Sequence, residues 1–389
     1  FGDELGRQAE VFAAWLREAH GVDLEAQGLE LRSSERHGLG VFAGRRVHPG
    51  EVFARIPASA VLHAGRVHAA DFGRQVLAAL GSGSSEAASA KGGEAAITPE
   101  ELLWLYMVWG RREPQACPWF GYLQSLPMQD PLAWITDDGA LRWLEGTPLA
   151  EAAQREAERQ RSRHAAIVGA LEKSDPKAFP LSRFSFEAWL WARSCYASRA
   201  FRRHSFPADF VEPGWESDLL CPLLDAFNHR QGAEVEWRFG ASSAVFVLPL
   251  SAVPYEAGEE LSIVYGHEVG NGRLLLDYGF AFARNPHDSV REVSFALPAA
   301  EAPQRLQRLL AAEVQGLEAE LEGGKVRVQL LEELRRKPLE TPQALLRAAS
   351  LLVLGCDYDE ASASCAEKCS AARAVAAALR RMLRETAPL

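Results

Sequence analysis

The sequence predicts an α+β fold in which two β-rich stretches flank a large helical insert and an all-α region follows. Short apolar pieces alternate with Gly and Pro between Leu29 and Leu62, and strand-like runs return after Leu219. Helical periodicity dominates between these stretches and again beyond about Pro286. The expected regions are an N-terminal helix over 1–27, a β-rich domain over 28–285 with its helical insert over about 63–215, and an α-helical domain over 286–389.

Composition describes an ordinary globular chain. Its 389 residues are 48% hydrophobic and 24% charged, which lies outside the range of disordered chains. The net charge of −10 disfavours non-specific nucleic-acid binding, because that needs a concentrated basic surface. No run approaches the roughly 18 apolar residues of a membrane span. We therefore expect a monomer that binds neither nucleic acid nor membrane.

The cysteines and the first residue bear on the cellular compartment. Six scattered cysteines are too few for a disulfide scaffold and suit buried thiols. Cys356, Cys365 and Cys369 have no close histidine, and a structural zinc site needs four ligands, so no metal site is expected. The chain opens with Phe1, which predicts an upstream segment. We expect an intracellular protein of the chloroplast or cytoplasm.

Several helices are signalled locally. Thr98, Pro99 and Glu101 form the start of a capping box, and Gly110 closes the apolar run that follows. Apolar residues at helical spacing predict a helix within the first 20 residues. Further helices are expected over about 148–172, from Ser185 onward, and over 303–321, 341–353 and 366–384.

A lone GxG turn lies near the N-terminus, at Gly38-Leu39-Gly40. A dinucleotide site would require a helix directly after the glycines, whereas Val41-Phe42 is strand-like. Two interpretations stay open: a plain hairpin turn, or a turn whose bare backbone lets a ligand approach closely.

Two later segments carry polar groups at the ends of apolar runs. Asp225, Asn228 and His229 follow an apolar stretch, and such groups form either a hydrogen-bonded knot or a ligand site. The run Glu260–Tyr265 is a strand that ends in tyrosine, which by itself is typical of the edge of a core. A short helix with a glycine stop follows at Asn271–Gly279.

Taken in order, these motifs resemble those of SET-domain protein methyltransferases. A GxG turn, an Asn-His pair after an Asp, a strand ending in Tyr and an Asn-x-x-Leu-Leu-x-x-Tyr-Gly-Phe run follow one another. The helical insert and tail narrow the resemblance to the branch of the Rubisco large-subunit methyltransferases and actin-histidine methyltransferases. It implies a split SET-domain β-fold, S-adenosylmethionine as cofactor and a helical Rubisco LSMT-like substrate-binding domain at the C-terminus.

The resemblance also implies roles for individual residues. Tyr265 falls on the catalytic tyrosine, and Arg199 falls on an arginine that helps to hold the cofactor, with Asp225 beside it. Phe280 falls on the aromatic residue that packs against adenine. The implied cofactor-binding residues are Gly38, Leu39, Gly40, Ser198, Arg199, Asp225, Asn228, His229 and Phe280. The candidate walls of a substrate channel are Phe201, Tyr278 and Trp237.

Methyl transfer is compatible with these residue types. An in-line displacement from a sulfonium to an amine needs alignment and desolvation more than a strong base. An apolar aromatic channel lowers the pKa of a lysine ammonium, and the Tyr265 phenol can orient the nitrogen lone pair. The resemblance therefore implies a protein-lysine N-methyltransferase with a non-histone protein substrate.

Two alternatives stay open. The actin-histidine enzymes carry an asparagine two residues after the cofactor arginine, where it can bond an imidazole, and this chain has Phe201 there. Because a lost buried hydrogen bond costs roughly 1–3 kcal/mol, the sequence favours lysine over histidine. The family often has Lys-Ser-Asn before the last helix. This chain has Val269-Gly270-Asn271 there, so only the asparagine matches. A non-catalytic SET-fold docking module is the second alternative.

Overall fold

The structure is a computed structural model in which the chain divides into two compact units. It describes residues 2–34, 38–81, 96–127, 130, 132–144, 148–207, 215–266, 269–282, 285, 292–296, 300, 302–311, 317–322 and 325–330. The first unit comprises Phe1–Thr136, Arg155–His267 and Asp277–Gly279. The second comprises Asp137–Gln154, Glu268–Leu276 and Phe280–Leu389.

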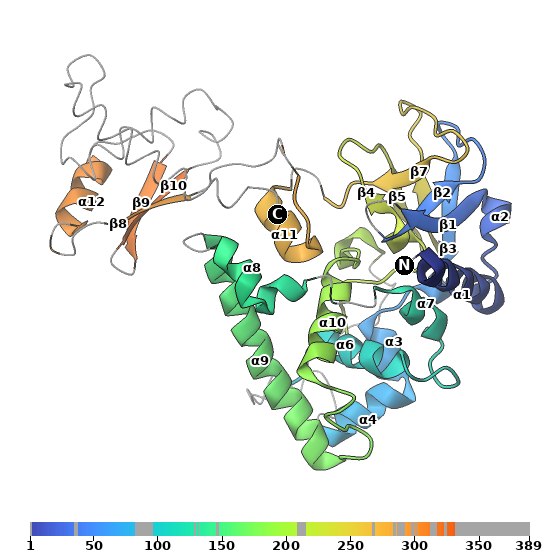
Figure 1. Ribbon diagram of the computed structural model, residues 1–389, viewed down its shortest axis with the longest axis horizontal. Helices are drawn as coiled ribbons and strands as arrows, with labels where there is room; N and C mark the ends of the chain where they lie inside the picture. The colour runs from blue at the N-terminus through green and yellow to red at the C-terminus, as the bar shows by residue number, and fades with distance from the viewer. Residues whose placement is uncertain are drawn as a thin grey trace. The chain divides into compact units, whose positions relative to one another are not determined.

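Two small sheets form the β part of the first unit (Figure 1). One has the strand order β1-β2-β7-β4 and the other β3-β6-β5. The strands are β1 (Leu29–Ser34), β2 (Gly38–Ala43), β3 (Val52–Pro57), β4 (Asn228–His229), β5 (Glu236–Phe239), β6 (Ser243–Val247) and β7 (Glu260–Ile263). Because β1–β3 precede the helical insert and β4–β7 follow it, each sheet combines strands from both β-rich stretches.

Helices occupy most of the chain between β3 and β4, where the helical insert is expected. The α-helices are α1 (Gly2–His20), α2 (Leu24–Gln27), α3 (Ala64–Ala69), α4 (Asp71–Ala79), α6 (Pro99–Gly110), α7 (Phe120–Ser125), α8 (Asp138–Trp143), α9 (Pro148–Ser174), α10 (Phe186–Ala197), α11 (Asn271–Tyr278) and α12 (Ala302–Ala311). Short 3₁₀ turns are η1 (Ala58–Ala60), η2 (Ala133–Thr136), η3 (Arg203–Ser205) and η5 (Leu224–Ala226).

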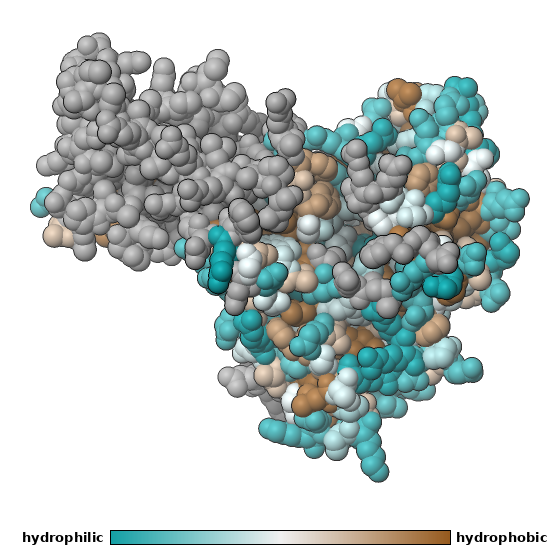
Figure 2. All heavy atoms as spheres, viewed as in Figure 1, coloured by the Kyte–Doolittle hydropathy of each residue, from teal (hydrophilic) through white to brown (hydrophobic). Residues whose placement is uncertain are grey.

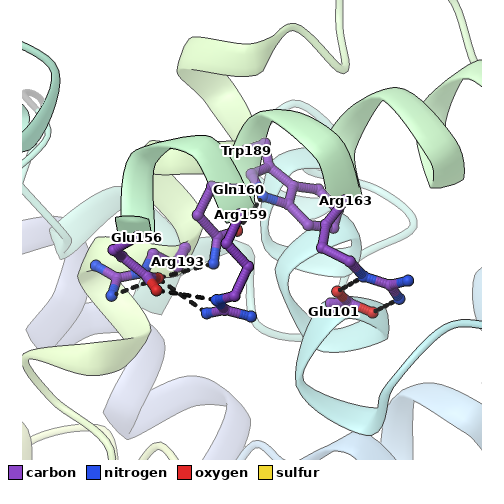
Figure 3. Close-up of polar contacts among 7 residues, drawn as sticks. All are labelled: Glu101, Glu156, Arg159, Gln160, Arg163, Trp189 and Arg193. Atoms are coloured by element: carbon purple, nitrogen blue, oxygen red, sulfur yellow. Dashed lines mark hydrogen bonds and ion pairs between the residues drawn. The ribbon is translucent and has the colours of Figure 1, made fainter. Parts of the chain in front are cut away.

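The predicted capping box of α6 is confirmed. The Thr98 hydroxyl accepts from the Glu101 amide at 3.2 Å, and the Glu101 carboxylate accepts from the Thr98 amide at 2.8 Å. Glu101 also pairs with Arg163 of α9, with an N–O distance of 2.6 Å (Figure 3). Trp189 of α10 donates its indole N–H to Gln160 of α9 at 2.8 Å. Polar contacts thus attach the Arg155–Ser174 part of α9 to both α6 and α10.

One hydrophobic core joins the two sheets to the helices of the insert. Phe53 and Phe246 contribute to it from the second sheet, and Tyr106 and Trp189 contribute from α6 and α10, each less than 2% exposed. The face in Figure 2 carries mainly hydrophilic side chains over the described residues of this unit, with small hydrophobic areas between them. No described helix is long and apolar enough to cross a membrane.

The all-α prediction for the C-terminal region is wrong in its described part. Helix α12 begins where a helix is expected, but it ends at Ala311, and Leu317–Glu322 and Lys325–Leu330 are strands. Strands β8 (Glu292–Ala296), β9 (Leu317–Glu322) and β10 (Lys325–Leu330) form an antiparallel sheet in the order β8-β10-β9 (Figure 1). The expected helices over 341–353 and 366–384 lie outside the described residues, as do Cys356, Cys365 and Cys369.

The reason for this error is visible in the sequence. Val326, Val328 and Leu330 alternate with polar residues at period two, the period of a strand, and Gly323-Gly324 supplies a turn signal. Val328 is completely buried. Strand pairing therefore outweighed the apolar spacing that suggested a helix through 321.

Candidate functional site

Three motifs that are far apart in the sequence meet at one end of β7. Strand β2 is antiparallel to β7, with Val41 opposite Leu261, so its glycine-rich start lies beside the end of β7. Strand β4 is parallel to β7, with Asn228 opposite Ser262, and ends on the same side. Tyr265 follows two residues after β7. Register alone brings the GxG turn, the Asn-His pair and the tyrosine together (Figure 1).

Tyr265 is anchored on three sides. Its hydroxyl donates to the Phe227 carbonyl at 3.1 Å, and its amide donates to His229 Nδ1 at 3.1 Å. Since Nδ1 accepts, the proton of a neutral His229 ring lies on Nε2. The Tyr278 hydroxyl donates to the Tyr265 carbonyl at 3.0 Å, and the two rings stack with centroids 4.8 Å apart.

Burial raises the pKa of Tyr265 to about 12, although the nearby Arg199 guanidinium acts in the opposite direction. Tyr265 is therefore a neutral phenol at physiological pH. It can donate one hydrogen bond and accept others, but it is not a ready-made base.

The GxG turn rests on a polar group beneath it. A Cβ atom on Gly40 would lie 2.6 Å from Glu260 Oε1 and 2.9 Å from Asn228 Nδ2, so only glycine fits there without displacement. Gly38 has φ +78°, the left-handed region that favours glycine, and a Cβ added to it would meet no atom within 4 Å. Gly38–Gly40, predicted as a turn, is the start of strand β2, because it pairs with Arg32–Ser34 of β1. The two glycines serve different purposes there: Gly40 permits close packing, and Gly38 permits the left-handed backbone.

Asn228 ties this turn to β7. Its side-chain amide donates to the Leu39 carbonyl at 3.3 Å and to Glu260 Oε1 at 2.7 Å. The Ser34 hydroxyl donates to Glu260 Oε2 at 2.9 Å. The side chain of Asn228 is thus part of a hydrogen-bonded knot, one of the two interpretations that the sequence left open.

Arg199 and Asp225 form a second polar group, next to Tyr265. Arg199 follows α10, and its Nη1 donates to the backbone carbonyl of Asp225 at 2.7 Å. The Asp225 carboxylate accepts instead from the hydroxyl of Tyr122 on α7. Burial raises the pKa of Asp225 to about 6, against the opposing effects of Arg199 and Tyr122. Burial alone would lower the pKa of Arg199, but Asp225 and its other neighbours raise it overall.

The backbone before Asp225 is strained. Leu223 is completely buried and has φ +79°, a conformation that costs a side-chain-bearing residue on the order of 1–3 kcal/mol. The surrounding core must hold this residue in place, since a free chain would relax. Strain of this kind often accompanies functional segments.

These residues fit S-adenosylmethionine, the cofactor that the resemblance implies. Among the described residues, none accepts a hydrogen bond from the buried Nε of Arg199. Buried N–H groups normally have acceptors, and an amino-acid carboxylate is a strong acceptor for guanidinium. The open space beside Gly38 allows a ligand to approach the backbone of the turn. Arg199 and the Gly38–Gly40 turn would therefore hold the cofactor.

The remaining predicted residues fall in different places. Phe201 is only 6% exposed, bridges to Leu219, and meets Trp237 edge-on with centroids 5.2 Å apart. Ser198 ends α10 by donating its hydroxyl to the Ser194 carbonyl at 2.9 Å. The roles of these residues in binding cofactor and substrate stay predictions.

Phe280 belongs to the second unit, unlike the other predicted site residues. Its ring packs edge-on against Phe282, with centroids 5.4 Å apart. In the same unit Asn271 donates to the Phe282 carbonyl at 2.7 Å and accepts from its amide at 2.8 Å. The contact of Phe280 with adenine stays a prediction.

Two residues near the site were not singled out from the sequence. Glu260 carried a weak signal, because it is a charged residue inside the predicted strand Glu260–Tyr265; its position opposite Phe42, on the face of Gly40, is known only from the strand register. Tyr122 carried no such signal, since it lies in an ordinary apolar segment of the insert. Within the described part of the chain, no group of three or more His, Cys, Asp or Glu side chains is placed to hold a metal ion.

Comparison with known proteins agrees with this arrangement. No family model matches the chain. It is 28% identical over 174 residues to the ribosomal lysine N-methyltransferase set10 of Schizosaccharomyces pombe, covering 44% of this chain and 29% of that protein. It is 26% identical over 268 residues to the N-lysine methyltransferase SETD6 of Rattus norvegicus, covering 67% and 52%. SET domain-containing protein 4 of Mus musculus is 25% identical over 279 residues, covering 71% and 59%. The chain thus spans less than two thirds of each relative's length.

Solved structures agree in fold. The SET domain of LSMT bound to lysine and AdoHcy aligns with a TM-score of 0.59 at 18% identity, over 90% of this chain and 72% of that one. The structure of Rubisco LSMT bound to AdoMet gives the same TM-score and identity, over 90% and 71%. The chain has the SET-domain α+β fold. Its resemblance to SET-domain methyltransferases is confirmed in sequence by these relatives, and its likeness to Rubisco LSMT is confirmed in fold.

Proposed function

We propose that this chain is an S-adenosylmethionine-dependent protein-lysine N-methyltransferase that acts on a non-histone protein. The observation that carries the proposal is the meeting of the Gly38–Gly40 turn, the Asn228-His229 pair and Tyr265 at one end of β7. The names of the relatives support it, since set10 and SETD6 are both lysine N-methyltransferases. LSMT binds lysine together with AdoHcy in its SET domain.

The chemistry follows from the state of Tyr265. S-adenosylmethionine supplies an electrophilic methyl group when it is bound. The Tyr265 hydroxyl is held by the Phe227 carbonyl, and its neutral oxygen can accept an N–H from a lysine amine, which would orient the amine's lone pair. The Tyr278 ring stacks on Tyr265 and helps to exclude water, which favours the neutral amine over the ammonium.

Lysine is the better substrate for this site than histidine. Phe201 lies two residues after Arg199 and packs against Trp237, so it presents an aromatic surface without a hydrogen-bonding group. Such a surface suits the aliphatic stem of lysine and gives an imidazole no polar partner.

The proposal extends to partners and compartment. A net charge of −10 supports a monomeric chain that does not bind nucleic acid, and the lysine N-methyltransferase relatives support a protein substrate. Cys117, Cys195 and Cys221 are free and buried in the described part of the chain, which supports a reducing intracellular compartment.

Two measurements test the function. In the first, a cell extract is incubated with the protein and isotope-labelled S-adenosylmethionine, and mass spectrometry locates the added methyl groups. We expect label on lysine; label on histidine alone would reject the lysine assignment. In the second, calorimetric titration with S-adenosylmethionine should show binding, whereas a docking module would show none.

A further inference from the structure

A tyrosine of the helical insert contacts a residue of the predicted cofactor site. Tyr122 lies on α7, is 1% exposed, and donates its hydroxyl to Asp225 Oδ2. Burial and the adjacent carboxylate raise the pKa of Tyr122 well above its usual value, so the hydroxyl keeps its proton and stays a donor.

Asp225 is bonded through different atoms to its two partners. Its carboxylate accepts from Tyr122, while its backbone carbonyl accepts from Arg199 Nη1 at 2.7 Å. Asp225 is only 6% exposed. Because Asp225 bonds to both Tyr122 and Arg199, a shift of Asp225 would also move the Arg199 guanidinium.

Helix α1 leaves the Tyr122 ring little room to move. A Cβ atom on the neighbouring Gly121 would lie 2.3 Å from Trp15 Cβ, so the backbone of α7 packs directly against the Trp15 side chain of α1. The Phe12 and Trp15 rings lie 6.0 and 6.2 Å from the Tyr122 ring. The indole of Trp15 donates to the Pro118 carbonyl at 2.8 Å, which holds α1 against the segment before α7.

We propose that Tyr122 is a positioning residue for the cofactor site: by holding Asp225 against α7, it keeps Arg199 in place to bind the carboxylate of S-adenosylmethionine. The buried Nε of Arg199, which has no acceptor among the described residues, is the group left for that carboxylate. This inference rests on the proposed function, because it assumes that the cofactor binds at Arg199.

The groups that face Asp225 define a pH test. They are Tyr122 of α7, Cys195 of α10, Arg199 after α10, Cys221 before η5 and Tyr265 after β7. Burial raises the pKa of the Cys195 thiol to about 12 and that of the Cys221 thiol also well above its usual value. Within this set, Asp225 is the group that titrates near pH 6. The Tyr122 hydroxyl favours its charged form, so removing that hydroxyl should raise the pKa of Asp225 further.

The experiment measures the dissociation constant of S-adenosylmethionine by calorimetry from pH 5 to pH 8 in the wild type and three variants. Relative to the wild type, Tyr122→Phe should bind about tenfold more weakly, the order expected for a lost hydrogen bond to a charged group. In the wild type, affinity should fall at low pH as Asp225 is protonated; this fall is called the acid limb. In Tyr122→Phe the acid limb should lie at higher pH, because the pKa of Asp225 is raised. Tyr106→Phe is the matched control: Tyr106 is an equally buried tyrosine of the insert, bonded to Cys117 at 3.5 Å rather than to Asp225.

The outcomes separate two failures. No binding by the wild type would reject the proposed function and this inference with it. Wild-type binding with an unchanged affinity and acid limb in Tyr122→Phe would reject the inference alone, as would an equal loss in Tyr106→Phe. The third variant, Asp225→Asn, keeps an acceptor for Tyr122 but cannot titrate, so the loss of affinity at low pH should disappear; a loss that persists would reject the inference. Melting curves confirm that each variant is folded.

Discussion

Two polar clusters flank Tyr265, and they are built in different ways. The strand cluster, made of Ser34, Asn228 and Glu260, lies on β1, β4 and β7 and is positioned by strand pairing. The buried cluster, made of Tyr122, Arg199 and Asp225, comes from α7, the end of α10 and η5. A ladder of backbone bonds supports the first, whereas the second depends on side chains in a desolvated core.

The difference predicts different responses to change. Substitutions in the strand cluster should act by changing local packing, because backbone pairing holds the sheet together without these side chains. Substitutions in the buried cluster should act through charge, because burial raises the pKa of Asp225 to about 6. Four experiments test this contrast, in order of decreasing expected effect.

Tyr265→Phe, between the clusters, sets the scale for a group that contacts the substrate. We expect kcat to fall on the order of 1000-fold, about 4 kcal/mol, because the phenol oxygen that orients the amine is lost. The dissociation constant of S-adenosylmethionine should change by less than about threefold, since both clusters remain intact. Methylation rates and calorimetry measure the two effects, and full activity in this variant would reject the assigned role.

Asp225→Asn tests the charge of the buried cluster through stability. The folded pKa of Asp225, about 6, is raised above its reference value of 3.8. The protonated carboxyl therefore contributes stability below about pH 4 that is lost as pH rises through 6. The unfolding free energy of the wild type minus that of the variant should fall by about 2.5 kcal/mol between pH 4 and pH 7. Urea unfolding at several pH values measures it; a difference that does not vary with pH would contradict the buried charge.

Gly40→Ala tests shape in the strand cluster. The new methyl group would lie 2.6 Å from Glu260 Oε1, so the turn or the carboxylate must move, at a cost of about 1–3 kcal/mol. We expect cofactor affinity to fall on the order of tenfold, with no shift in its pH dependence. Gly169→Ala on α9 is the control, because a Cβ there meets nothing within 4 Å and should stabilise the helix by about 0.5–1 kcal/mol. Equal effects of the two substitutions would argue against close packing at Gly40.

Ser34→Ala should have the smallest effect. It removes one hydroxyl donor from Glu260, which keeps its bond from Asn228 at 2.7 Å. A net loss of about 1 kcal/mol in unfolding free energy and less than threefold in cofactor affinity is expected. A larger loss than that of Tyr122→Phe would reverse the proposed ranking of the two clusters.

Local sequence signals predicted the local structure well. Thr98 and Glu101 lie three residues apart, and their reciprocal bonds form as the pattern indicates. The tail shows the limit of such reasoning. Its residues 317–321 fit a helix by apolar spacing, but pairing with β10 gives a strand, because tertiary contacts override weak propensity.

By itself, the sequence determined the α+β class, the order of the motifs and the choice of Gly40, Asn228 and Tyr265 as candidate residues. Strand register then carried these residues to one end of β7. Only the tertiary structure decided that Tyr122 meets Asp225, since the two are 103 positions apart and no helical or strand period connects them. The physical reason is burial: once Asp225 leaves water, its carboxylate requires a donor, and the packing of α1 on α7 places one there.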